Sequence, residues 1–173
     1  MTGHAPTHTR TYRRLVEGTT INGTSLLSTD YLNHFNEIVM LLELSVDMPD
    51  MVAEIEQWQP KSYVQHFRDS GFSYGELAVA AYDHAPVAFR QPFDATVDEI
   101  NRIITEVLPR VRTMLAGEHP GAARDRILLL AHALRAKIER ASAIINGSRA
   151  EELDAKPETG GMIGQKDIDA LFD

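Results

Sequence analysis

Two long stretches of helical hydrophobic periodicity, separated by only a few residues, constrain the fold of this chain most strongly. In the first, apolar residues recur at alternating steps of three and four, at Val97, Ile100, Ile104, Val107, Val111 and Met114. In the second, the same steps join Ile127, Ala131, Leu134, Ile138, Ala141 and Ile145. Residues with this spacing share one face of an α-helix. Because the link at 117–119 is short, we expect the two helices to pack antiparallel as a hairpin.

The rest of the chain predicts shorter helices, so the expected fold class is all-α. Further helical patterns cover residues 28–44, 47–57, 62–68 and 73–82. Pro109 lies inside the first long pattern and is expected to kink or split that helix near Leu108. The sequence therefore predicts a helical bundle built on the long antiparallel hairpin, with shorter N-terminal helices and a flexible C-terminal tail.

Composition divides the 173 residues into three parts. Residues 1–27 are polar, with many Thr and Ser, and are expected to form a flexible N-terminal arm with little regular structure. Residues 28–147 are expected to form the helical bundle domain. Residues 148–173 are expected to form an acidic linker and a short C-terminal amphipathic helix. This last part carries half of the net charge of -8, as is common for solvated interaction tails.

Composition also excludes several classes of function. The chain has no cysteine, which rules out disulfides, thiolate metal sites and cysteine nucleophiles. The net charge of -8 argues against a nucleic-acid surface, because phosphate affinity needs clustered Lys and Arg. No apolar run approaches the ~20 residues that cross a bilayer, and the N-terminus does not resemble a signal peptide. We therefore expect a cytoplasmic, bacterial protein that binds neither nucleic acid nor membrane, and no cofactor is predicted.

Asp30 and Asn33 are the candidate catalytic residues. They lie three residues apart near the start of a predicted helix, and therefore about one turn apart. An amide can orient a water molecule in line with an aspartyl phosphate, and a carboxylate can hold that water or a cation. The competing interpretation is that Asp30 only satisfies free N–H groups at the helix start.

His34, Glu37 and His132 are the candidate metal ligands. His34 and Glu37 lie at i and i+3 on the first bundle helix, and His132 lies on the last. Helical bundles that bind two metal ions use Glu-x-x-His units, which this chain lacks, so the prediction is a mononuclear site. The alternative is that each histidine is a half-buried side chain bonded to a neighbouring helix.

The last residues of the chain, Gln165 to Phe172, read QKDIDALF. Ile168, Leu171 and Phe172 fall at i, i+3 and i+4, and would share one face of a two-turn helix. This segment resembles the N-terminal peptide of the flagellar switch protein family FliM and is similar to the C-terminal peptide of the CheZ phosphatase family. Both family peptides bind a CheY-like response regulator receiver domain in bacterial chemotaxis as a short helix.

The resemblance implies a role for each side chain of the segment. Ile168, Leu171 and Phe172 would be anchors in the receiver, and Asp167 and Asp169 would face its basic groups. CheZ-type proteins also place a long helical hairpin before a linker and the binding peptide. They carry an acid and a Gln four residues apart on a long helix, a pair absent here, so Asp30 and Asn33 would have to promote dephosphorylation.

Three alternatives to a signalling role remain open in the sequence. The bundle could be an enzyme or a metal-binding protein that uses His34, Glu37 and His132. The chain could be a structural homodimer in which the apolar faces of the long helices meet across two copies. The C-terminal amphipathic segment could also dock on the chain's own surface or on a second copy, because a short amphipathic helix fits a groove on any of these molecules.

Overall fold

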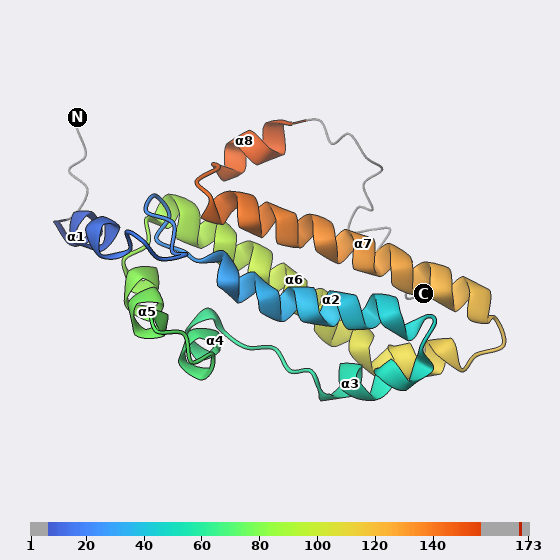
Figure 1. Ribbon diagram of the computed structural model, residues 1–173. Coiled ribbons are helices and arrows are strands. Elements are labelled where there is room, and N and C mark those ends of the chain that lie inside the picture. The colour runs from blue at the N-terminus through green and yellow to red at the C-terminus, as the bar shows by residue number, and fades with distance from the viewer. Residues whose placement is uncertain (1–6, 157–169, 171–173) are drawn as a thin grey trace.

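The computed structural model describes residues 7–156 and residue 170 (Figure 1). Within these residues every regular element is a helix, apart from one isolated antiparallel bridge between Ile21 and Ser28. The elements are α1 (Thr7–Leu15), η1 (Thr29–Leu32), α2 (Asn33–Ser45), η2 (Pro49–Met51), α3 (Val52–Gln57), α4 (Tyr63–Asp69), α5 (Gly75–Asp83), α6 (Val87–Leu115), α7 (Pro120–Ile145) and α8 (Ala150–Ala155). The predicted all-α fold class is confirmed.

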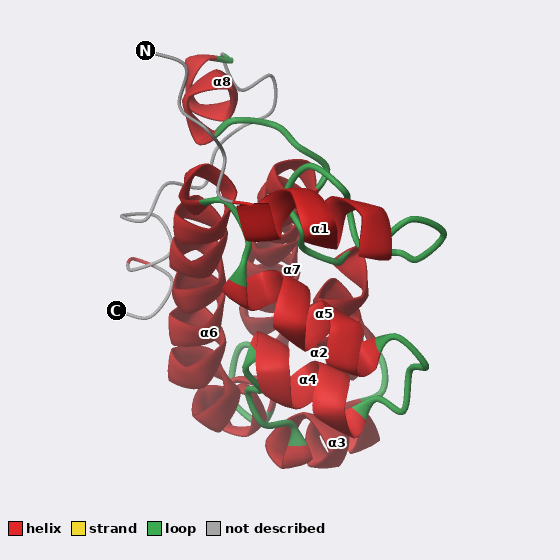
Figure 2. Cartoon of the chain, turned by 90° about the vertical axis from the view of Figure 1, so that its left-hand side faces the viewer, coloured by secondary structure: helices red, strands yellow, loops and turns green. Residues whose placement is uncertain are grey.

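The centre of the molecule is the predicted hairpin of α6 and α7, with α2 alongside α7 (Figure 1). All the predicted apolar positions of the two long helices are buried, except Met114, which is partly buried against the core. From α2, the core receives Phe35, Ile38, Val39 and Leu42, all fully buried. Figures 1 and 2 both place α3 and α8 on opposite sides of this bundle.

Two prolines lie inside α6, and the helix continues through both. It begins at Val87, so Pro92 falls near its start, and Pro109 does not split it near Leu108 as expected. A proline removes one backbone hydrogen bond from a helix interior. Val107 and Val111, which flank Pro109, are fully buried in the hairpin. Their burial holds the backbone helical where the local propensity would end it.

The expectation of little regular structure over residues 1–27 is wrong where the structure describes them. Residues 7–15 form α1, and the segment after it buries Val16, Ile21, Leu26 and Leu27. Asn22 organises this segment, because its side-chain oxygen accepts from the backbone N–H groups of Thr24 and Ser25, at 2.8 and 3.1 Å. The Ser25 hydroxyl donates to the carbonyl of Ile145 at 2.5 Å. The segment therefore packs on the C-terminal end of α7.

The acidic linker expected after residue 147 also contains regular structure, because residues 150–155 form α8. The backbone N–H of Arg149 donates to Glu152 at the start of this helix, at 3.3 Å. Arg140 of α7 pairs with Asp154 at 2.8 Å and holds α8 against the bundle. Of the helices that the structure describes, none has the length and apolar character needed to cross a membrane.

A single glycine sets the spacing of α4 and α5. A Cβ atom at Gly75 would lie 2.7 Å from the backbone carbonyl oxygen of Phe67. Such a distance is a steric clash, so only glycine lets the start of α5 approach the end of α4 this closely. This approach positions Tyr74 and Tyr82 beside the site residues described below.

Candidate functional site

Asp30 is held by three hydroxyl groups. Its Oδ2 atom accepts hydrogen bonds from Thr20 at 2.5 Å, from Ser28 at 3.4 Å and from the hydroxyl of Tyr74. The N-cap of η1 is Ser28, whose side chain accepts from the backbone N–H of Asp30. Asp30 therefore links the N-terminal segment, through Thr20, to the start of α5, through Tyr74. Its observed contacts are those of a structural anchor.

Asp30 and Asn33 nevertheless line the same hollow of about 350 Å³, as their spacing predicts. Arg135, Glu139 and Ser142 of α7 form its opposite wall. Asn33 is exposed, so its amide is free to contact a molecule from solution. Arg135 makes a bidentate pair with Glu43, at 2.8 and 2.6 Å, and this hydrogen bonding lowers the pKa of the Glu43 carboxyl. The hollow therefore presents the Asn33 amide beside Asp30 and Glu139, and its one cationic lining residue, Arg135, is paired with Glu43.

His34 and Glu37 line a second hollow, of about 330 Å³, together with His66, Lys61 and Asp69. The ring of His34 stacks on Trp58 with the ring centroids 4.5 Å apart. The Nε2 atoms of His34 and His66 are both buried and have no hydrogen-bond partner among the described residues. Two imidazoles therefore share a partly apolar site, with their ring centroids 6.3 Å apart.

The structure does not bring the three predicted metal ligands together. His132 is exposed on α7, and it does not line the hollow that contains His34 and Glu37. Over residues 7–156 and 170, no group of three or more His, Asp or Glu side chains could hold a metal ion. His34 is half-buried, as the alternative expected, but it contacts the rings of Trp58 and Phe35, and its Nε2 atom has no hydrogen-bond partner among the described residues.

Burial makes the stability of the bundle depend on pH through His34. Burial lowers the pKa of His34 to about 4, and also lowers the pKa of His66. In the unfolded chain, His34 therefore binds a proton near pH 6.5, whereas in the folded protein it stays neutral at that pH. We expect the free energy of unfolding to fall as the pH drops from about 6.5 toward 4, where folded His34 itself becomes protonated.

Urea unfolding at several pH values in this range measures the dependence. The variant His34→Gln should lose part of the acid sensitivity, whereas His132→Gln, an exposed control, should keep it. An identical pH slope for the His34→Gln variant and the unaltered protein would show that His34 does not cause the effect.

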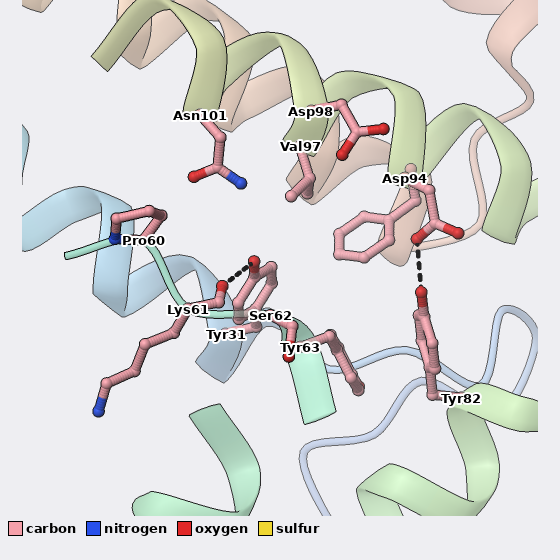
Figure 3. Close-up of a pocket in the computed structure, with 11 residues that line it drawn as sticks. Tyr31, Pro60, Lys61, Ser62, Tyr63, Tyr82, Asp94, Val97, Asp98 and Asn101 are labelled. Carbon is pink, nitrogen blue, oxygen red and sulfur yellow. Dashed lines mark hydrogen bonds between the residues drawn. The ribbon is translucent and has the colours of Figure 1, made fainter. Parts of the chain in front are cut away.

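A third hollow, of about 400 Å³, lies between α6, η1, α5 and the segment before α4 (Figure 3). Its walls include the buried aromatic residues Tyr31, Tyr63 and Phe93. The Tyr31 hydroxyl donates to the carbonyl of Lys61 at 2.7 Å, and the Tyr82 hydroxyl donates to Asp94 at 2.8 Å. Burial raises the pKa of the Asp94 carboxyl above its usual range. The hollow is thus aromatic at its base and acidic along α6.

Sequence reasoning missed this third hollow. Asp94, Asp98 and Asn101 follow one another at i, i+4 and i+7 on α6, which is also the spacing of an ordinary solvated helix face. The aromatic wall comes from η1, α4 and α6, which are far apart in the sequence. The sequence does contain a cluster of Trp, Tyr and Phe residues between positions 58 and 74. Such a cluster indicates a packed aromatic region, but it does not indicate that a hollow lies beside it.

The predicted receiver-binding residues Asp167, Ile168, Asp169, Leu171 and Phe172 lie outside the described residues. No protein-family model, curated protein or solved structure matches this chain.

Proposed function

We propose that this protein is a bacterial cytoplasmic signalling protein whose helical bundle presents the segment Gln165–Phe172 to a CheY-like receiver domain. The observation that carries the proposal is the pattern of this segment. Its apolar residues Ile168, Leu171 and Phe172 would form one face of a short helix, and acidic residues flank them. A helix of this kind binds by inserting its apolar face into a groove of the partner.

The chemistry of the segment assigns a role to each group. Ile168, Leu171 and Phe172 would be the anchors, because large apolar side chains dominate such interfaces. Asp167 and Asp169 supply negative charge, which speeds the encounter with a basic surface and fixes orientation. Pro157, Gly160, Gly161 and Gly164 precede the segment, a composition that is typical of linkers.

A second role, promotion of receiver dephosphorylation, is favoured by one observation. Asp30 and Asn33 line one hollow on the bundle, where an amide and a carboxylate can orient water. That water would attack the phosphorus atom of the aspartyl phosphate, the P–O bond to the aspartate would break, and inorganic phosphate would leave. Because the hydroxyl contacts of Asp30 already suit a structural anchor, Asn33 is the residue on which this role depends.

A binding titration with purified receiver domains tests the main proposal. The double substitution Leu171→Ala and Phe172→Ala, made in the full chain, should weaken binding by about a hundredfold or more, because it removes two of the three apolar anchors. The helical circular dichroism signal should stay unchanged. Binding should also tighten when the receiver carries a phosphoryl mimic such as beryllofluoride.

A matched control keeps the result specific. Lys166→Ala alters the same segment on the side opposite the face that Ile168, Leu171 and Phe172 would form, and this variant should bind like the unaltered protein. Equal binding by the Leu171→Ala and Phe172→Ala variant would contradict the proposal. Loss of phosphatase stimulation in Asn33→Ala, with binding intact, would support the second role; full stimulation would remove it.

A further inference from the structure

The hollow on α6 shown in Figure 3 has the features of a small-molecule site that the proposed function does not use. Its volume of about 400 Å³ falls within the range of such sites, which are mostly apolar with a few placed polar groups. Tyr31 and Phe93 are each 1% exposed and form a fixed aromatic wall. A ligand here would contact side chains that are already held in place by the core.

Two hydrogen-bond acceptors in this hollow have no partner among the described residues, although the Asn101 side chain also hydrogen-bonds to Tyr31. The Oδ1 atom of Asn101 is buried and has no hydrogen-bond partner in the described part of the chain. Asp98 lies one turn before Asn101 on α6, at the rim, and no ion pair or hydrogen bond to another described residue holds its carboxylate. An unpartnered buried acceptor is unfavourable, so a donor from a ligand would be stabilised there.

Lys61, the one cationic residue that lines the hollow, does not pair with Asp98 or Asn101. Lys61 lines the hollow, but its ammonium group pairs with Asp69 at 3.1 Å and points away from Asn101 and Asp98 (Figure 3). The charge balance at the Asp98 end is therefore negative. Consistent with this, Asp94 and Asp98 both contribute to the raised pKa of Tyr31, after burial, which is the main cause.

Next to the hollow, outside its lining, Arg90 shows how a cation can lie against one of its tyrosines and one of its carboxylates. There the guanidinium of Arg90 lies 4.2 Å from the centre of the Tyr82 ring, and its Nε is 3.6 Å from Asp94. A cation between a tyrosine face and a carboxylate is a favourable arrangement, and it gains strength where water is excluded. The Asp98 end offers the same partners, an aromatic wall and a carboxylate, without a cation.

From this geometry we propose that the hollow binds a small primary amine with an apolar body. The ammonium group would donate to the Asp98 carboxylate and to Oδ1 of Asn101, and the body would pack on Tyr31 and Phe93. An ammonium group suits this pair because it carries three N–H donors and a positive charge. The site is independent of the C-terminal segment and of the receiver-binding proposal.

Calorimetric titration of the full chain with three probes of similar shape tests the site. The probes are 2-phenylethylamine, the neutral 2-phenylethanol and the anionic phenylacetate. The amine should bind saturably in the millimolar range, with an affinity at least about tenfold above that of the alcohol, because only the amine forms charged hydrogen bonds. Phenylacetate should not bind. Equal binding of amine and alcohol, or no saturable binding of the amine, would overturn the proposal.

Two variants place the amine within the hollow. Asp98→Asn should lower the amine affinity by about tenfold, because it removes the charge from an exposed residue without altering the core. Asn101→Leu should also lower it, by removing the acceptor at nearly constant volume. Asp125→Asn removes the same charge from the exposed surface of α7 and should leave the affinity unchanged. An amine affinity for Asp98→Asn equal to that of Asp125→Asn would overturn the assignment.

Discussion

Replacement of Phe35 by alanine should lower the free energy of unfolding by about 3–5 kcal/mol, a large share of the 5–15 kcal/mol typical of a domain. Phe35 is fully buried on α2, and its ring packs edge-on against Tyr31 with the centroids 5.2 Å apart. The substitution would leave a cavity between α2 and its neighbours that fixed helices cannot close. Urea unfolding, followed by the fluorescence of the single tryptophan, Trp58, measures the change.

Phe72→Ala is the matched control for this prediction. Phe72 is 39% exposed and stacks only on neighbouring rings, so its removal should cost less than about 1 kcal/mol. Equal losses for the two phenylalanines would mean that α2 does not form part of the cooperative core.

Asp30→Ala should lower the free energy of unfolding by about 2 kcal/mol, because hydrogen bonds to a charged group contribute more than neutral ones. Three hydroxyls, on Thr20, Ser28 and Tyr74, would lose their common acceptor. The loss would loosen the N-terminal segment from α5. Thermal or urea unfolding of the variant gives the change directly.

Asn33→Ala separates this anchoring role from catalysis. Asn33 is exposed and lines the same hollow, so its truncation should change stability by no more than about 0.5 kcal/mol. If Asp30→Ala were as stable as Asn33→Ala, the hydroxyl contacts would not be important for the fold. Tyr74→Phe, which removes one donor, should lie between the two.

The core of the fold could be predicted from the sequence because two long patterns repeat without interruption. Val97, Ile104, Val111 and their partners on α7 mark one face over many turns, and burial of that face outweighs the local effect of Pro109. A pattern of this length has few alternative interpretations.

The N-terminal segment could not be predicted in the same way. Its order comes from polar side chains that bond the backbone, such as Asn22 and Ser25, and polar composition alone is typical of a flexible arm. The third hollow was missed for a related reason. Its polar residues Asp94, Asp98 and Asn101 have the spacing of a solvated face, and only the tertiary structure places Tyr31 and Tyr63 opposite them.

The hydrogen bond from Ser25 to the carbonyl of Ile145 has a consequence for how the chain is made. The two partners are 120 residues apart in the sequence. At a synthesis rate of about 5–20 residues per second, the ribosome adds Ile145 about 6–24 s after Ser25. Leu26 and Leu27 lie next to Ser25 and are fully buried in the folded protein. During that interval they cannot pack near the end of α7, because it has not yet been synthesised. The segment around Ser25 therefore completes its packing only after the end of α7 has been released from the ribosome.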